Sequence, residues 1–477
     1  MELHHLTATK ARELFEAKEL SPVELLDAVV ARTAAVEPGI NALTEEMLDD
    51  AYAAARTSQE RFAAGGSQLG ALEGIPLLLK EEQPIAGRLN EEGSLTEKGT
   101  IAEASHPIVD RIFNAGAVVH GRTTTPEFCC APYTHSKLWG VTRNPWNTDL
   151  TPGGSSGGSG AALAAGESIL ATGSDIGGSI RIPSSFSGIV GFKPPFGRVP
   201  GLAPFNQDTY CADGPMGRSV ADVALLQNVI AGPHRVDQAS LRPAYTLPAP
   251  NAAAAVGMRV ALCINLGDYI VDPVIEANTR AAADALRSAG VIVEEITLPW
   301  TRKQIVEAAW AHFGGIMGPF ITEIAGANSD LLMPYTLDFA KRAAQAGSFA
   351  EGLVAEAAIY EPLGKVFETY DALLCPTLAT QGMAADFADP AALVDVGGAQ
   401  VPWIESALTV PFNVIGRVPV LALPSGMAPN GLPTGVQLVG RTYDDATVFA
   451  LGQAFEEALG LWTSDSWWPA MNAAANA

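Results

Sequence analysis

Glycine and serine are concentrated in residues 151–185, which read TPGGSSGGSGAALAAGESILATGSDIGGSIRIPSS. Glycine at this density indicates a backbone that turns sharply or approaches another group closely. The serines beside the glycines are candidate nucleophiles, but the segment contains no histidine to accept their protons. A base must therefore come from elsewhere in the chain.

Apolar runs of strand length alternate with helical patterns along the chain. Buried strands are predicted for ALEGIPLLLK, RVPVLALPSG and PTGVQLVG, and further strands for AGAVVHGRT, MRVALCI, VIVEEITLP and DALLCPT. Helices are predicted for GRSVADVALLQNVIAG, for DATVFALGQAFEEALG and for the first sixty residues, where Ser21, Pro22 and Glu24 form a capping box with proline at the first helical position. This alternation predicts an α/β protein with one sheet.

The net charge and the cysteines of the chain argue against several classes of function. The formal net charge of −23 disfavours binding to nucleic acids and to anionic membranes. No apolar run reaches the roughly 18 residues of a membrane span, and the N-terminus has no signal core. The five cysteines show neither metal-ligand spacing nor an even-numbered framework. We therefore expect a cytoplasmic protein with reduced thiols.

Three kinds of chemistry compete for the glycine- and serine-rich segment. A phosphate cradle of the Walker form needs a lysine, which the segment lacks. Residues 154–158 match the nucleophile elbow G-x-S-x-G, but the two histidines that follow, His234 and His312, have no recognisable loop context. A serine–lysine hydrolase needs a distant lysine, because the S-x-x-K form is absent.

Lys80 is the candidate base because it ends the apolar run GIPLLLK. Lysine is rarely buried without a partner, and burial lowers its pKa toward the range in which the neutral amine acts as a base. The alternative is a surface lysine that pairs with Glu81 or Glu82. The residues alone favour this simpler alternative.

A long, ordered set of motifs decides between these alternatives. GGSSGGSGAALAAG, GSDIGGSIRIPSSFSGIVGFKP and GPMGRSVADVALL follow a GIPxLxK strand, and PEF, NPWN, TPGG and LPTGVQLVG stand around them. In these motifs, over nearly its whole length, the chain resembles the amidase signature family. The resemblance implies the α/β amidase signature fold, a central, mostly mixed, twisted sheet covered by helices on both faces. It also implies a single domain over residues 1–477, with an N-terminal helical segment (1–65), a catalytic core (70–232) and a helical substrate-funnel region (300–370).

The resemblance also assigns roles to residues. Ser179 matches the family's acyl-forming nucleophile, Ser155 the bridging serine that follows a cis peptide bond, and Lys80 the terminal base. The backbone amides of the oxyanion hole match Ile176, Gly177, Gly178 and Ser179. Three further residues match positions that brace these loops: Ser156, Asp175 and Arg181. No metal or cofactor is implied.

Two features depart from the family pattern. The family commonly has K-D-N where this chain has Lys80-Glu81-Glu82. A glutamate facing the lysine would favour its charged form; strand alternation directs Glu81 away and leaves Glu82 open. The second departure is the pair Cys129 and Cys130, which by resemblance borders the acyl side of the pocket. These cysteines are as consistent with apolar filling as with a role in specificity.

The substrate is constrained less sharply. Trp310, Phe313 and Met317 form an apolar stripe at helical spacing, which suits a core, although in the family this region walls the substrate funnel. We expect a monomeric or homodimeric amidase that cleaves a neutral, bulky or aryl amide through an acyl-enzyme, with carbamates (urethanes) and aryl esters open to the same chemistry. The alternatives are the amidase subunit of a tRNA-dependent amidotransferase, which the acidic charge and Ile176 disfavour, and a non-catalytic relative, which the intact triad disfavours.

Overall fold

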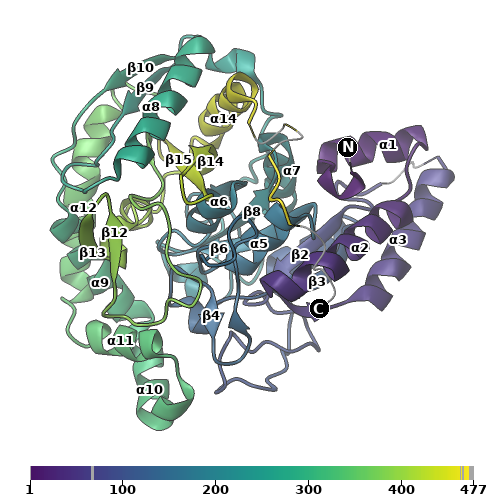
Figure 1. Cartoon of the computed structure of the whole chain (residues 1–477), viewed down its shortest axis with the longest axis horizontal. Helices are drawn as coiled ribbons and strands as arrows, with labels where there is room; N and C mark the ends of the chain where they lie inside the picture. Colours follow the sequence, from purple (N-terminus) through teal and green to yellow (C-terminus); the bar gives the residue numbers. More distant parts are fainter. Residues whose placement is uncertain (1, 66–68, 462–463, 465–466, 472–477) are drawn as a thin grey trace.

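The computed structural model describes residues 2–65, 69–461, 464 and 467–471 (Figure 1). Met1 and residues 472–477 of the predicted domain lie outside this description. Eleven strands of the described chain form one sheet: β1 (Leu43–Glu46), β2 (Pro76–Lys80), β3 (Val118–Thr123), β6 (Leu170–Asp175), β7 (Val190–Lys193), β8 (Ala212–Gly217), β9 (Arg259–Leu262), β10 (Ile292–Glu295), β11 (Ala372–Pro376), β14 (Val420–Met427) and β15 (Pro433–Gly440). Their order across the sheet is β1-β3-β2-β6-β8-β7-β14-β15-β11-β9-β10.

The sheet is mixed. Strand β2 pairs in parallel with β3 and β6, and β9 pairs in parallel with β10 and β11, whereas the strands between β6 and β11 pair antiparallel. Two small antiparallel pairs lie outside it: β4 (His135–Ser136) with β5 (Gly140–Val141), and β12 (Leu393–Val396) with β13 (Ala399–Pro402). The predicted α/β class with a mixed sheet is confirmed.

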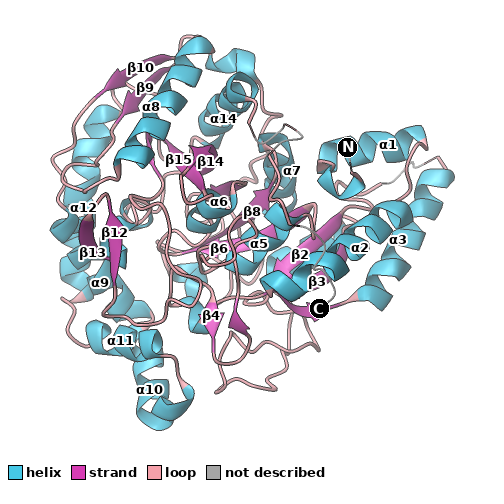
Figure 2. Cartoon of the chain, in the orientation of Figure 1, coloured by secondary structure: helices cyan, strands magenta, loops and turns pink. Residues whose placement is uncertain are grey.

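Helices surround the sheet (Figure 2). The α-helices are α1 (Ala8–Ala17), α2 (Pro22–Ile40), α3 (Leu48–Ala63), α4 (Pro107–Asn114), α5 (Gly157–Ala165), α6 (Arg181–Ser187), α7 (Val220–Ile230), α8 (Pro273–Ser288), α9 (Arg302–Ile316), α10 (Gly318–Asn328), α11 (Pro334–Ala343), α12 (Phe349–Val366), α13 (Pro411–Val414) and α14 (Asp445–Leu459). The capping box at Ser21 and Glu24 is present, and Ser219 caps α7 as its sequence predicts.

Alternation along β11 shows how both faces of the sheet are covered. Leu373 and Cys375 pack into a core with α6, α9 and α12, whereas Ala372 and Leu374 pack into a second core with α7, α8 and α14. Successive residues of a strand point to opposite faces, so one short apolar run serves both cores. The expected helical cover on both faces is confirmed.

The prediction for the N-terminal segment needs one correction. Residues 1–65 are not wholly helical, because β1 interrupts them and pairs antiparallel with β3 at the edge of the sheet. Its sequence, LTEE, has little apolar signal of its own. Pairing with a neighbouring strand, which local sequence does not report, determines its conformation. Among the described residues, no helix is long and apolar enough to cross a bilayer.

Candidate active site

Two parallel neighbouring strands bring the predicted site residues together. Strand β2 ends at Lys80 and β6 ends at Asp175, so their carboxyl ends lie at the same edge of the sheet. Residues 176–180 connect β6 to α6, and Ser155 lies two residues before α5. The Ser156 amide donates to the Ser179 carbonyl over 3.1 Å, which joins the two serine-containing segments. The Gly154–Ser155 peptide bond is cis, as the resemblance implied.

The Lys80 ammonium has three hydrogen-bond acceptors. Its Nζ lies 2.7 Å from Ser155 Oγ, 2.8 Å from Ser174 Oγ and 2.7 Å from Glu82 Oε2. The Lys80 side chain is fully buried. Since an ammonium carries three N–H donors, this arrangement satisfies the charged form of the lysine completely. The structure therefore places Lys80 and Ser155 in contact, as the resemblance predicts.

Glu82 is the glutamate that faces the lysine. Glu81 points elsewhere and accepts from the Glu91 and Glu92 amides. Burial alone would lower the pKa of Lys80, but the negative charge of Glu82, and of Cys129 when ionised, raises it above the usual lysine value. Burial would raise the pKa of Glu82, yet the lysine holds it below the usual range. The pair therefore favours its charged form.

Cys129 extends this cluster. Its thiol donates to Glu82 Oε2 over 3.3 Å, and its sulfur lies 3.0 Å from Thr125 Oγ1. Burial, followed by the neighbouring Glu82 charge, raises the pKa of Cys129 to about 12. Near neutral pH this residue is a neutral thiol that donates a hydrogen bond, so it is not a nucleophile there. Cys130 also lines the site, but its thiol donates to the Phe128 carbonyl and not to the lysine cluster.

Backbone amides around Ser179 are partly available. The Gly178 amide donates to Asp175 Oδ1 over 2.8 Å, so it is occupied in this arrangement. Within the described chain, the amides of Ile176, Gly177 and Ser179 make no hydrogen bond. Gly178 has a φ of +124°, and a Cβ there would lie 2.2 Å from Thr409 Oγ1, which explains the need for glycine. Three of the four predicted oxyanion amides thus remain open to a ligand.

A buried ion pair holds this loop. Arg181 Nε and one of its terminal nitrogens each lie 2.9 Å from the Asp175 carboxylate, and both side chains are fully buried. Burial would raise the pKa of Asp175, but the Arg181 guanidinium lowers it below the usual range. Arg181 also donates to the Thr409 carbonyl, Asn413 and Gln437. Asp175 and Arg181 therefore brace the loop, whereas Ser156 contributes contacts with Ser174.

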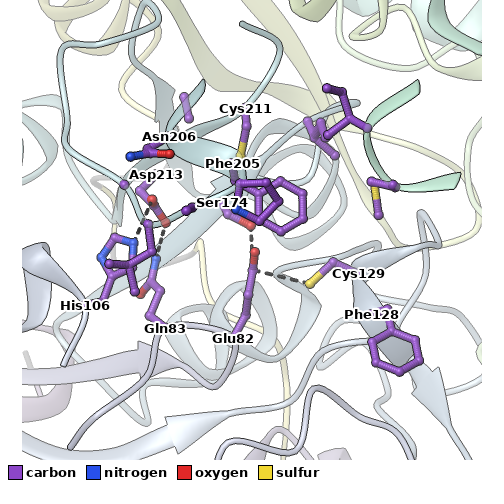
Figure 3. Close-up of a pocket in the computed structure, with 18 of the residues that line it drawn as sticks. Glu82, Gln83, His106, Phe128, Cys129, Ser174, Phe205, Asn206, Cys211 and Asp213 are labelled. Atoms are coloured by element: carbon purple, nitrogen blue, oxygen red, sulfur yellow. Dashed lines mark hydrogen bonds and ion pairs between the residues drawn. The ribbon is translucent and has the colours of Figure 1, made fainter. Parts of the chain in front are cut away.

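Two cavities meet at these residues. The larger, of about 350 Å³, is lined by Glu82 and Ser174 (Figure 3). Ser155 and both polar and apolar side chains complete its lining. The smaller, of about 50 Å³, is lined by Ser179 and by apolar and backbone groups. Both cavities share Cys129, Ile176 and Met317. Within the described residues, no hydrogen bond links the Ser155 and Ser179 hydroxyls; such catalytic contacts often tighten only when substrate binds.

The predicted substrate-binding residues do gather here. The smaller cavity is lined by every one of them: Cys129, Cys130, Trp310, Phe313 and Met317. The two histidines considered for a nucleophile elbow do not line either cavity; His312 is buried against Asp208 with an Nε2–Oδ1 distance of 2.5 Å.

Several contributors were not predicted. Ser174 bridges Lys80 and Glu82, and Asn413 supports Asp175 over 2.8 Å. His106, Gln83 and Asp213 form a polar group on the wall of the larger cavity (Figure 3). Ser174 could have been predicted, because it belongs to the GSD motif and residues along a strand such as β6 alternate between the two faces of the sheet. Gln83 follows Lys80 closely but belongs to no recognised motif, and Asn413, His106 and Asp213 lie in more distant segments. No cluster of potential metal ligands occurs in the described part of the chain.

Comparisons with known proteins agree with this geometry. The amidase family model matches residues 24–449. A glutamyl-tRNA(Gln) amidotransferase subunit from Symbiobacterium thermophilum is 32% identical over 493 residues, covering 95% of this chain and 96% of that protein. The crystal structure of a bacterial aryl acylamidase superimposes with a TM-score of 0.88 at 27% identity, covering 96% of this chain and 97% of that one. A 6-aminohexanoate cyclic dimer hydrolase gives 0.83 at 29%, covering 98% and 99%.

The Arg181 brace predicts a measurable stability difference. Arg181→Met leaves the Asp175 carboxylate buried without its cation and should lower the free energy of unfolding by about 3–5 kcal/mol. Arg280→Met is the matched control, since Arg280 is likewise ion-paired, with Glu276 and Glu295, but is 44% exposed. It should cost less than about 1 kcal/mol. Urea titration of both variants tests this, and equal losses would contradict the bracing role.

Proposed function

Since the chain belongs to the amidase family, we propose that it hydrolyses the C–N bond of neutral amides through Ser179, Ser155 and Lys80. The observation that supports this most directly is the 2.7 Å contact between Lys80 Nζ and Ser155 Oγ. Both residues are fully buried, and the cavity that Ser155 lines shares lining residues with the cavity of Ser179. A surface lysine, the simpler alternative from sequence, would not be buried among three acceptors.

The chemistry follows as acyl transfer in two halves. Ser179 Oγ attacks the amide carbonyl, and its proton passes to Ser155 while Ser155 passes its own proton to neutral Lys80. The open amides of Ile176, Gly177 and Ser179 stabilise the negative oxygen. The proton then returns through Ser155 to the departing nitrogen, leaving Ser179 acylated. Water attacks the acyl-enzyme by the same route and releases the acid.

Glu82 sets the pH range of this mechanism. Lys80 must lose its proton before it can accept one from Ser155, and the Glu82 carboxylate stabilises the charged lysine. A raised lysine pKa reduces the neutral fraction at neutral pH, so the rate should rise into alkaline pH. The apparent pKa of this limb belongs to the coupled lysine–glutamate–serine group.

The two cavities suggest how the substrate lies. Ser155 must protonate the departing nitrogen, and it lines the cavity of about 350 Å³. The acyl group, attached to Ser179, then occupies the cavity of about 50 Å³. We therefore propose a bulky or aryl amine carrying a small acyl group as the substrate. Carbamates and aryl esters present a comparable carbonyl to the same serine and belong to the same proposal.

A second candidate is the amidase subunit of a tRNA-dependent amidotransferase. The 32% identity with the Symbiobacterium amidotransferase subunit, over 95% of this chain, favours it. The net charge of −23 is a poor match for a protein that works beside RNA, although other subunits can carry the RNA contacts.

Assay of the purified chain alone separates the two candidates. A stand-alone amidase should cleave a chromogenic acyl anilide without any other protein, and Ser179→Ala should abolish both this activity and labelling by a serine-directed fluorophosphonate. A chain that leaves anilides intact, and becomes active only with the other subunits of such an amidotransferase and charged tRNA, would support the second candidate instead.

Removing the base should affect amides more than activated esters. An amide nitrogen needs a proton to leave, whereas a nitrophenolate leaves readily. Lys80→Ala should therefore lose about 10²–10⁴-fold in kcat/KM on an anilide and less on the matched nitrophenyl ester. Kinetics of both substrates in the wild type and variant test this. Equal losses would show that Lys80 does not supply the leaving-group proton.

Neutralising Glu82 should move the pH profile in a defined direction. Glu82→Gln removes the charge that stabilises protonated Lys80, so the lysine pKa falls and the rising limb of kcat/KM should shift by about 1–3 pH units toward acid. Glu81→Gln is the matched control, because Glu81 points away from the lysine. Loss of activity at every pH in Glu82→Gln would instead make Glu82 a proton acceptor in its own right.

A further inference from the structure

A third cavity, of about 540 Å³, lies next to the small cavity that holds Ser179. Among the described residues, the two linings have one member in common, Trp310. We propose that Trp310 is the partition that limits the length of the acyl group, and that the third cavity, named here the outer groove, would extend the acyl site if the indole were removed. This inference rests on the proposed amidase function.

The helices around Trp310 show how it comes to separate the two spaces. Trp310 and Phe313 on α9, and Met317 just after its end, line the Ser179 cavity. Glu307 and Ala311, on the neighbouring face of α9, line the outer groove. Trp310 stands at the boundary between these faces. One side chain therefore belongs to both walls.

The side chains of helix α11 also divide between the Ser179 cavity and the outer groove. Phe339 lines the Ser179 cavity, and its ring centroid lies 5.2 Å from that of Trp310. Arg342, one turn later, lines the outer groove, and its guanidinium lies 5.8 Å from the Trp310 ring centroid. The indole thus lies between an apolar ring on the Ser179 side and a cation on the groove side. Truncating it would remove most of the partition.

Polar contacts do not fix the indole in place. Trp310 Nε1 is buried and, within the described chain, has no hydrogen-bond partner. A buried indole N–H usually finds an acceptor, so the position of this ring depends on packing and on the Arg342 guanidinium over its face. The groove wall beside it includes small residues such as Ala308, Ala346 and Gly352, and charged side chains such as Glu351 lie among them. Small side chains leave room that a longer acyl chain would fill.

The volumes define the expected selectivity. A water-sized group needs roughly 10–15 Å³ of such space, so the Ser179 cavity of about 50 Å³ holds roughly four groups of that size. An acetyl or butyryl group fits this limit, and an octanoyl group exceeds it. With the outer groove added, the acyl site gains about 540 Å³. The wild type should therefore select short acyl groups, and opening the partition should favour long ones.

The experiment measures kcat/KM for the 4-nitroanilides of acetic, butyric, hexanoic and octanoic acids. In the wild type we expect a fall of at least about tenfold from butyryl to octanoyl, since a single methylene in a tight pocket changes specificity about 10–200-fold. In Trp310→Ala the ratio of octanoyl to acetyl rates should rise at least about tenfold. Trp403→Ala is the matched control, because Trp403 lines the Ser179 cavity and not the outer groove.

A double variant that fills the outer groove with a new side chain tests whether the groove accepts the longer acyl groups. In Trp310→Ala/Ala346→Phe, an aromatic ring occupies the outer groove from its half-buried rim, and the wild-type preference for short acyl groups should return. Two results would overturn the proposal that Trp310 limits acyl length. One is an active Trp310→Ala variant whose ratio of octanoyl to acetyl rates equals that of the wild type. The other is the same rise of this ratio in Trp403→Ala.

A binding measurement separates this inference from the proposed function. If the wild type cleaves no anilide, the proposed function fails. Octanamide binding, followed by the thermal midpoint of unfolding, then tests the partition without turnover: tighter binding to Trp310→Ala than to the wild type supports it, and equal binding overturns it.

Discussion

The buried contact between Lys80, Ser155, Ser174 and Glu82 is the interaction on which the site depends. A lysine without partners at this depth would be destabilising, because its charge would lose the solvation of water. Here three acceptors satisfy the ammonium, and Glu82 balances its charge. Strand β2 supplies the lysine, β6 supplies Ser174, and the segment before α5 supplies Ser155. The parallel pairing of β2 with β6 is what brings these segments to one point.

Most of the fold follows from local sequence. Apolar runs predicted the buried strands, and the caps at Ser21 and Ser219 predicted helix starts that the structure confirms. Strand β1 was missed because LTEE carries little apolar pattern and forms its strand by pairing with β3. Strands β6, β7 and β8, which lie within or after the glycine- and serine-rich segment, were not predicted either. The order of the strands also lies beyond local sequence: β7 sits between β8 and β14, and no periodicity reports such long-range neighbours.

The residues of the candidate site also divide into those that the sequence predicts and those that it does not. Motif resemblance predicts Lys80, Ser155 and Ser179 as site residues, and strand alternation correctly directed Glu81 away from the lysine. Asn413, Asp213 and His106 could not be found, because they reach the site from distant segments and belong to no local pattern. Nor could the sequence show that Trp310 borders two cavities, since a helical stripe reports which face is apolar but not what lies on each side of it.

A second buried lysine shows why geometry must decide which one acts as base. Burial lowers the pKa of Lys193 to about 7, which on titration alone would make it the better base. Its ammonium, however, donates to the carbonyls of Pro194, Gly416 and Val418, and it lines neither active-site cavity. Lys80 has the less favourable pKa but contacts a serine at the cavity wall. A base must reach the proton it removes, so in the proposed mechanism position outweighs pKa, and the charge of Glu82 would set the pH range in which Lys80 accepts a proton.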